Sequence, residues 1–295
     1  MKTRILAWLR YPRKKKPSNG PYETFHDNGQ LSCRGNYSDG KKDGPEESHW
    51  ENGQLKSRGS YKTGAEDGPW QKYFDTGETE FEGCYANGKL DGIQQWFHKN
   101  GQLREKQPHD HGTKNGRWEL FYENGEVKSR GNYDNGQRDG PFEIFYANGG
   151  LRSRGRHKQD KRDGAYESYH ENGQLESAGT YTDGRKDRNW ERFHDNGQLE
   201  SAGIFKAGKQ NELWKTFHKN GQLKSKVHYA DGRQHGACEE YADDGQLIVK
   251  QNYKAGKQDG PYESYDESGK LKTRGMFRDG ELEGPVELYE NGVLQ

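Results

Sequence analysis

The stretch YENGEVKSRGNYDNGQRDGP, from Tyr122 to Pro141, is rich in Asx-Gly pairs and has almost no aliphatic side chains. Similar stretches occur elsewhere in the chain: HDNGQLSCRGNYSDGKKDGP begins at His26, and HENGQLESAGTYTDGRKDRN begins at His170. Self-similarity at a fixed spacing is the signature of a repeat architecture. The chain is therefore a tandem repeat, and one copy contains the pattern that decides the fold.

The copies follow one another every 24 residues. They open at positions 20, 44, 68, 92, 116, 140, 164, 188, 212, 236, 260 and 284. The first eleven repeats are complete and the twelfth is truncated, so residues 20–295 form one repeat array after a separate leader, residues 1–19. Slot 1 denotes the opening position of a repeat and slot 24 its last.

Each repeat carries two turn signals. Slot 10 is glycine in every complete repeat, as at Gly125 and Gly173. Slots 20 and 21 read Asx-Gly in most repeats, as at Asp39 and Gly40, and such pairs favour a two-residue hairpin turn with both residues at positive φ. Two turns of two residues leave two strands of about ten residues, at the long end of the usual range. Each repeat is expected to contribute two antiparallel strands.

Two-residue turns preserve the alternation of side chains between the two faces of a sheet. Slots 3, 5, 7, 12, 14, 16 and 18 are therefore expected on one face, and slots 4, 6, 13, 15 and 17 on the other. Slot 6 is aromatic in every repeat except the second, where it is His49, and predicts an aromatic ladder. Glu119 at slot 4 is expected opposite Arg130 at slot 15, a cross-strand pair that contributes about 0.2–1 kcal/mol.

Composition limits how much core this sheet has. Hydrophobic residues make up 27% of the chain and its mean hydropathy is −1.45, values that alone would suggest disorder. The strict period argues against disorder, while the shortage of Leu, Ile and Val excludes a thick sandwich core. We expect an all-β fold: an elongated, twisted, largely single-layer antiparallel meander whose apolar surface comes from aromatic rings and Lys and Arg stems.

The leader is basic, with seven Lys or Arg and no acid in residues 1–19. Its apolar run, Ile5 to Leu9, is too short for a transmembrane helix, and no small-residue cleavage site precedes the basic cluster. A solvated basic tail is the first interpretation. A weak contact with an anionic membrane surface through Leu6, Trp8, Leu9 and Lys14 to Lys16 is the second. Nucleic-acid contact is the least favoured.

The three cysteines, Cys33, Cys84 and Cys238, occupy different slots and form neither a disulfide framework nor a C-x-x-C pair. A reducing cytosol is the simplest compartment for such a chain, which predicts a cytoplasmic protein.

Histidine recurs at slot 7 in several repeats, and this recurrence raises the question of whether neighbouring histidines could bind a metal ion. Equivalent slots are two strands apart, about 9.6 Å, which is too far to share one ion. Stacked cross-strand histidines are therefore expected. The recurring histidines in question are His98, His170, His194 and His218.

The fourth repeat departs most from the pattern, with Pro108 in a strand followed by His109, Asp110 and His111. Proline interrupts ladder hydrogen bonds, so a bulge or hinge is preferred there over a metal site, for which no fourth ligand is evident. No nucleophile-base pair or phosphate-binding glycine loop stands out from the repeats. The sequence predicts no enzyme activity, no metal and no cofactor.

The recurring pattern Y-x-x-N-G-x-L-x-x-x-G-x-Y-x-x-G-x-x-D-G-P resembles MORN-variant repeats, especially those of the bacterial YwqK-family antitoxins, over roughly residues 20–295. The resemblance implies an all-β scaffold that neutralises a toxic protein by binding it, which makes a cognate toxin the expected partner. The alternative is a scaffold or adaptor associated with a membrane surface through the basic leader.

A partner surface is expected in repeats 3 to 6, because slot 5, elsewhere mostly polar, becomes Trp96, Leu120 and Ile144 in successive repeats. Aromatic residues at slots 3 and 7 are predicted on the same face, so an exposed patch of the kind that binds proteins is one interpretation. A larger sheet-stabilising cluster is the other. The candidate residues are Phe74, Trp96, Trp118, Leu120, Tyr122, Phe142, Ile144 and Tyr146.

Overall fold

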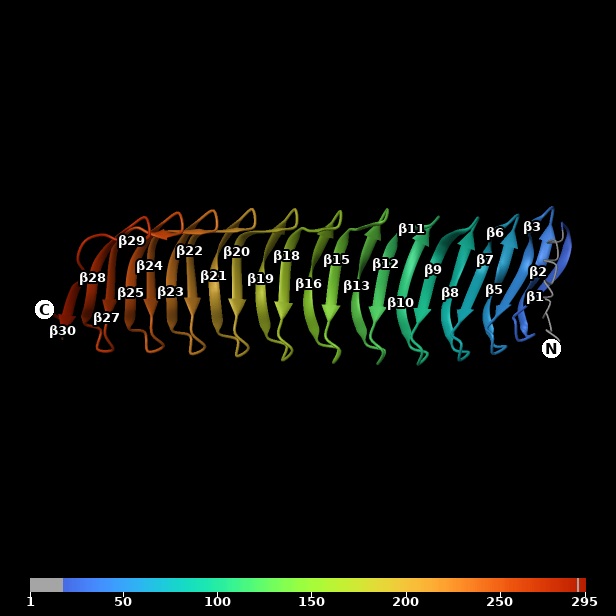
Figure 1. The fold of residues 1–295 in the computed structure, drawn as a ribbon, viewed down its shortest axis with the longest axis horizontal. Helices are drawn as coiled ribbons and strands as arrows, with labels where there is room; N and C mark the ends of the chain where they lie inside the picture. The colour runs from blue at the N-terminus through green and yellow to red at the C-terminus, as the bar shows by residue number, and fades with distance from the viewer. Residues whose placement is uncertain (1–17, 291) are drawn as a thin grey trace, which may run out of the picture. The chain divides into compact units, whose positions relative to one another are not determined.

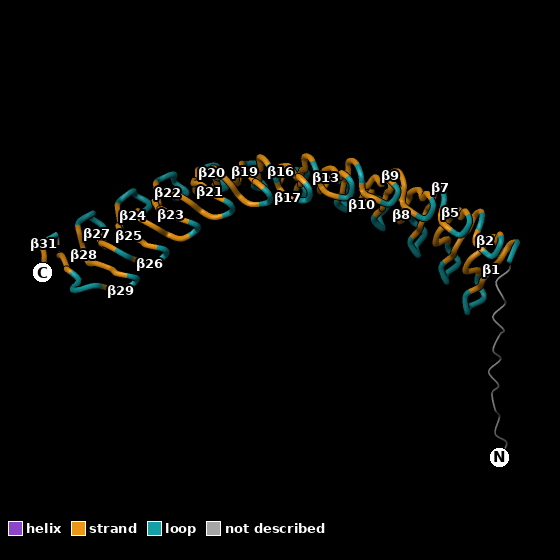
Figure 2. The backbone as a smooth tube through the Cα atoms, turned by 90° about the horizontal axis from the view of Figure 1, so that it is seen from above, coloured by secondary structure: helices purple, strands orange, loops and turns teal. Residues whose placement is uncertain are grey.

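The computed structural model describes residues 18–290 and 292–295, which contain strands, turns and loops and no helix (Figure 1). The chain divides into two compact units, residues 1–115 and 116–295, which are described separately. Within each unit consecutive strands pair in antiparallel fashion in chain order, as a single-layer meander (Figures 1 and 2). The all-β meander predicted from the sequence is confirmed. The predicted membrane contact of the leader falls on residues 1–17, outside the described residues.

The strands of the first unit are β1 (Gly20–Phe25), β2 (Leu31–Ser38), β3 (Lys41–Lys42), β4 (Gly44–His49), β5 (Leu55–Lys62), β6 (Ala65–Glu66), β7 (Gly68–Tyr73), β8 (Thr79–Ala86), β9 (Lys89–Phe97), β10 (Leu103–Asp110) and β11 (Thr113–Lys114).

The strands of the second unit are β12 (Gly116–Phe121), β13 (Val127–Asp134), β14 (Gln137–Arg138), β15 (Gly140–Phe145), β16 (Leu151–Lys158), β17 (Lys161–Arg162), β18 (Gly164–Tyr169), β19 (Leu175–Thr182), β20 (Arg185–Phe193), β21 (Leu199–Lys206), β22 (Lys209–Phe217), β23 (Leu223–Ala230), β24 (Arg233–Tyr241), β25 (Leu247–Lys254), β26 (Lys257–Gln258), β27 (Gly260–Tyr265), β28 (Leu271–Arg278), β29 (Glu281–Leu282), β30 (Glu287–Glu290) and β31 (Val293–Leu294).

The turn at slots 20 and 21 has the predicted conformation. Asp39 and Gly40 have φ values of 47° and 74°, and Ser38 pairs with Lys41 directly across the turn. Both central residues thus lie in the left-handed region, as a type I′ hairpin requires. Even Ala207 adopts a φ of 51° at slot 20, so the repeat holds this turn where the sequence does not favour it.

The turn around slot 10 differs from the prediction. The His26 amide donates to the Gln30 carbonyl (2.8 Å), the Gly29 amide donates to the His26 carbonyl (2.9 Å), and of the loop residues only Gly29 has positive φ (85°). The loop is longer than two residues, and the register shifts between Thr24 and Phe25. Because Phe25 then pairs with Leu31, slot 12 lies on the same face as slot 6. The prediction that both turns preserve the alternation of faces was wrong at this turn.

Strand length also differs from the expected ten residues, because a bulge interrupts most repeat boundaries. The Asp43 amide, between β3 and β4, donates to the Asn36 carbonyl (3.0 Å), and Gly44, the first residue of β4, takes a φ of 89°. The pairing of β2 shifts by two residues across this point, from Tyr37 with Lys42 to Arg34 with Glu47. Slots 24 and 1 therefore break one long strand into a two-residue and a six-residue segment.

The core is a row of aromatic rings at slots 3 and 18 on one face, named here the core face. Trp70, Phe142 and Trp190 are 5%, 5% and 4% exposed. Rings of neighbouring slots meet edge to face, as for Tyr181 and Trp190, whose centroids lie 5.1 Å apart at 84°. Each such pair adds about 0.5–1.5 kcal/mol of stability beyond the contribution from burying its apolar surface. This extra stability is useful to a sheet with few aliphatic residues.

Glycine at slot 16 makes room for this aromatic row. A β-carbon at Gly179 would lie 2.3 Å from the Trp190 ring, and Gly179 does not have positive φ. Glycine is therefore needed at position 179 because the indole ring leaves no space for a β-carbon, and not because the backbone has a positive φ. Where slot 16 is the larger Val227, its cross-strand partner at slot 3 of the next repeat is Cys238 instead of an aromatic residue.

Side chains at slot 7 join each repeat to the next. The His170 Nε2 donates to the Phe193 carbonyl (2.9 Å), and the Trp50 Nε1 donates to the Tyr73 carbonyl (3.1 Å) in the same way. His170, His194 and His218 are thus hydrogen-bond donors to the neighbouring repeat, and the contact selects the Nε2–H tautomer. This explains why His, Tyr and Trp share slot 7: each offers a donor at the end of a planar ring.

Candidate functional site

The eight residues predicted to bind a partner divide between the two units. Phe74 and Trp96 lie in the first unit and the other six lie in the second. All eight are half-buried or, for Phe142, buried. Slots 3 and 5 share the core face as predicted, because Trp118 and Leu120 lie in alternation on β12 opposite Gly131 and Ser129.

Several of these side chains already have partners within the sheet. Trp96 packs on Phe81 with ring centroids 5.2 Å apart. The Tyr122 hydroxyl donates to the Phe145 carbonyl (2.9 Å), and the Tyr146 hydroxyl donates to the Tyr169 carbonyl (2.7 Å). These contacts stabilise the sheet. Binding of a partner by the eight residues stays a prediction.

The opposite face, named here the open face, presents slots 2 and 17 to solvent. These two slots pair directly across each hairpin, as in Pro69 with Cys84 and Ile93 with Pro108. Ile93 is 54% exposed, and Pro69 and Cys84 are also exposed. These four residues of repeats 3 and 4, named here the open-face patch, form an apolar surface in the first unit.

Sequence reasoning missed the open-face patch, although it singled out the same repeats. The available signal was slot 2, where most repeats have Pro, Ala or a polar residue and only Ile93 and Leu213 are large and aliphatic. Pro108 was expected to mark a bulge or hinge. Instead β10 continues through Pro108, which pairs with Ile93, and its carbonyl accepts from the Asn115 amide (3.1 Å) as in other repeats.

In the second unit the open face contains a groove of about 860 Å³. Its lining on this face includes the exposed side chains of Arg117 and Arg156, and arginine is a residue type that often anchors protein interfaces. Ion pairs between neighbouring repeats form part of the lining, with Arg130 Nε 2.5 Å from Glu143 and Arg154 Nε 2.7 Å from Glu167. The open-face lining of the groove is thus mainly charged, and two of its arginines are held in ion pairs.

Hydrogen bonds to the Glu167 carboxylate favour its ionised form. The hydroxyl of Tyr169 and the guanidinium of Arg154 hold the pKa of Glu167 below its usual value. The predicted opposition of Glu119 and Arg130 is confirmed, but the Arg130 side chain makes its ion pair with Glu143 of the next repeat.

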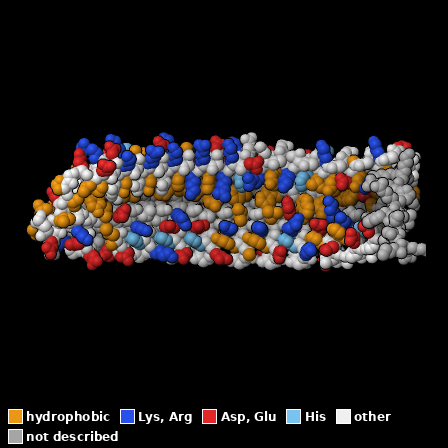
Figure 3. Space-filling view, viewed as in Figure 1, with side chains coloured by type: hydrophobic (Ala, Val, Ile, Leu, Met, Phe, Trp, Pro, Cys, Tyr) orange, Lys and Arg blue, Asp and Glu red, His pale blue; other side chains and the backbone are white. Residues whose placement is uncertain are grey.

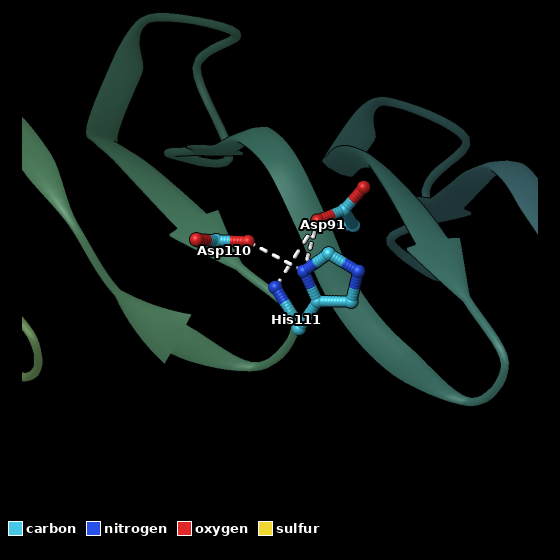
Figure 4. A group of neighbouring side chains, drawn as sticks. All are labelled: Asp91, Asp110 and His111. Atoms are coloured by element: carbon cyan, nitrogen blue, oxygen red, sulfur yellow. Dashed lines mark hydrogen bonds and ion pairs between the residues drawn. The ribbon is translucent and has the colours of Figure 1, made fainter.

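Asp91, Asp110 and His111 lie together in the first unit (Figure 4). His111 Nδ1 lies 2.5 Å from an Asp110 oxygen and 3.9 Å from an Asp91 oxygen, and hydrogen bonding to Asp110 raises the pKa of His111. The Asp91 carboxylate also accepts from the His111 amide (3.1 Å), as Asp43 accepts from the Thr63 amide (3.0 Å) two repeats earlier. In many repeats a slot 24 aspartate accepts a hydrogen bond from the amide at slot 20 of the next repeat. The cluster is therefore a variant of this structural arrangement.

The structure does not assemble the trio His109, Asp110 and His111 that the sequence raised as a possible ligand set. His109 is buried, with its Nδ1 3.3 Å from the Gln107 carbonyl, and desolvation lowers the pKa of its imidazole. Asp91 takes its place beside the other two, and three exposed or half-exposed groups are the whole of this set among the described residues.

Glu46 occupies slot 3, where most other repeats place an aromatic ring, and is 9% exposed. Its carboxylate accepts from the Tyr22 hydroxyl and lies 2.5 Å from Lys42 Nζ, which in turn sits 4.7 Å from the centre of the Tyr61 ring. Burial and these hydrogen bonds raise the pKa of Tyr22. The buried charge is compensated by its neighbours, as stable burial of a carboxylate requires.

The repeats match a known family. Residues 18–39, 42–63, 66–87, 90–111, 114–135, 162–183, 213–231, 234–255 and 258–279 each match the MORN repeat variant. The chain belongs to this family of non-catalytic repeats, which generally bind proteins or membranes. No curated protein matches the chain.

Alignments to solved structures add little. The crystal structure of TcdB2-TccC3 aligns with 13% identity over 89% of this chain and 15% of its own, with a TM-score of 0.17. The structure of TcdB2-TccC3 without its hypervariable C-terminal region aligns with 12% identity over 93% and 18%, with a TM-score of 0.19. The chain thus spans less than a fifth of either structure, and such scores establish no common architecture. Among the described residues no helix is long and apolar enough to cross a membrane.

Proposed function

We propose that this chain is a cytoplasmic antitoxin or immunity-type scaffold, which neutralises a toxic protein by binding it and has no enzymatic activity of its own. The observation that carries the proposal is the open-face patch, where Ile93 is 54% exposed within a paired strand and is flanked by Pro108. Exposed apolar groups on a rigid repeat array are typical of protein-binding surfaces. The groove with Arg117 and Arg156 offers a second anchoring region in the other unit.

The test uses the product of the gene adjacent to this one as the candidate toxin. Co-expression of this chain is expected to restore growth, and calorimetry is expected to show direct binding. Ile93→Lys should weaken binding at least tenfold, about 1.4 kcal/mol, because it places a charge in an apolar contact. Ile248→Lys is the matched control, since Ile248 is 42% exposed in the other unit.

The same assay separates the two candidate faces. Trp96→Ala and Leu120→Ala alter the core face, and a tenfold loss of binding by a folded variant would place the partner there instead. Equal binding by wild type and Ile93→Lys would reject the open-face patch. A flanking gene product that is harmless and does not bind would contradict the antitoxin role, and leader-dependent binding to anionic liposomes would favour the membrane-associated scaffold.

A further inference from the structure

A row of basic side chains follows one edge of the second unit. Slot 22, the first position after the type I′ turn, is Lys or Arg in five successive repeats, and all five side chains are exposed. Lys and Arg gather along the upper edge of the space-filling view, over the part that holds β18 to β28 (Figure 3). The row, named here the basic edge, consists of Lys161, Arg185, Lys209, Arg233 and Lys257.

Packing against the neighbouring turn gives the side chains of this row a common direction. A β-carbon at Gly208 would lie 3.5 Å from the Arg185 Cβ, and one at Gly232 would lie 3.6 Å from the Lys209 Cβ. Each stem therefore lies beside the turn glycine of the next repeat. The charged ends follow one another at the pitch of the repeat, two strands or about 9.6 Å.

Little within the described chain neutralises the basic edge. Lys161 makes a long ion pair with Asp183 (3.8 Å), and the other four members of the row make none. The Asp187 carboxylate accepts from the Ala207 amide, whereas slot 24 is the neutral Asn211 in the next repeat. The most basic part of the edge is therefore the part between repeats 8 and 10.

Two hollows lie on this edge. One of about 480 Å³ is lined by Lys161, Arg185 and Lys206, together with Asp183 and Asp187. The other, of about 400 Å³, is lined by Lys209 and Arg233, with His235 and Asp231. Both lie at the same position between consecutive turns, two repeats apart, and each brings two members of the basic edge together beside aspartate side chains.

We propose that the basic edge binds an extended acidic polypeptide segment with an acidic residue at every third position. A polyproline II chain has three residues per turn and rises 3.1 Å per residue, so every third side chain faces the same way about 9.3 Å apart. That spacing is close to the roughly 9.6 Å expected for two strands, which is the repeat of the basic edge. Nucleic acid fits less well, because phosphates are more closely spaced and the edge offers no aromatic residue on which bases stack. This site is separate from the open-face patch and does not depend on the proposed toxin.

The test compares two synthetic peptides with the full chain. One repeats Glu-Pro-Pro five times, and the other has the same composition with its five glutamates consecutive. Fluorescence anisotropy at low salt is expected to show at least fivefold tighter binding of the spaced peptide, weakening as salt rises. The double variant Lys209→Glu/Arg233→Glu should lose at least tenfold of this affinity.

The control variant is Lys224→Glu/Lys272→Glu, which makes the same change in net charge at exposed slot 13 lysines outside the basic edge. It should bind the spaced peptide within about twofold of wild type. Circular dichroism confirms that both variants are folded. Absence of binding by wild type, or equal affinity for both peptides, would overturn the proposal. Tighter binding of oligothymidylate, lost in Lys209→Glu/Arg233→Glu, would assign the edge to nucleic acid instead.

Discussion

Glycine serves two different purposes at the scale of single residues. At Gly173 the backbone has a φ of 85° and an added β-carbon would meet no neighbour within 4 Å. At Gly179 the backbone is not in the left-handed region, but the Trp190 ring fills the space that a β-carbon needs. Replacement by alanine is therefore expected to destabilise the protein through backbone strain at Gly173 and through a steric clash with the Trp190 ring at Gly179.

A double-mutant cycle separates these costs. Gly179→Ala is expected to destabilise the protein by about 1–3 kcal/mol, because the Trp190 ring must move, and most of this cost should vanish in a Trp190→Ala background. Gly173→Ala is expected to cost about 1–2 kcal/mol in both backgrounds, since its cost is positive φ. Urea denaturation of the four variants and two parents measures the coupling. An unchanged cost of Gly179→Ala after removal of the indole would refute the packing argument.

The repeat pattern made the Asx-Gly turn and the Glu119 and Arg130 pairing predictable, because both depend on short-range chemistry. The loop at slot 10 was harder, because its glycine fits either a two-residue turn or a bulged loop, and only the loop length decides the face of Leu31. The open-face patch was missed for a related reason. Exposure of Ile93 follows from the position of the bulge, which the pattern of residue types does not specify.

Carboxylates at slot 4 act at the scale of paired strands, where they join a tyrosine two residues on to a base on an adjacent strand, either the preceding or the following one. The Glu239 carboxylate accepts from the Tyr241 hydroxyl (2.7 Å) and lies 3.1 Å from Lys226 Nζ. The tyrosine hydrogen bond, followed by the lysine, holds the pKa of Glu239 below its usual value. Glu263 has the same arrangement with Tyr265 and Arg274.

The pH dependence of stability follows from the direction of this shift. A carboxyl whose pKa is lower in the folded state adds stability above its unfolded pKa, about 4.3, and this stability is lost as pH falls through the folded pKa. Tyr241→Phe removes the hydroxyl, so the pKa of Glu239 should rise toward its usual value, and the loss of stability on acidification should become smaller. Carbon-detected NMR titration of Glu239 measures the change, with Glu263 as the internal control. A titration midpoint of Glu239 that does not move would show that the hydroxyl is not the cause.

At the scale of the whole molecule, the chain is a series of repeats that contact mainly their neighbours through the aromatic row and the slot 7 donors. Arrays of this kind have stabilities close to the sum of single-repeat and nearest-neighbour contributions, so damage is expected to stay local. Trp214 tests this, because it is 8% exposed, packs on Phe205 with centroids 5.0 Å apart, and donates from Nε1 to the Ile204 carbonyl (3.0 Å).

Trp214→Ala is expected to lower the free energy of unfolding of its own repeat by about 3–5 kcal/mol, the usual range for removal of a buried aromatic side chain. Native-state hydrogen exchange should show lower protection in β21 (Leu199–Lys206), β22 (Lys209–Phe217) and β23 (Leu223–Ala230). Protection in β1 to β8 of the first unit should remain within about twofold of wild type, because Trp214 packs on Phe205 and bonds Ile204 within the second unit. A uniform loss of protection along the described residues would instead mean that the array unfolds as one cooperative body, and the nearest-neighbour account of its stability would be wrong.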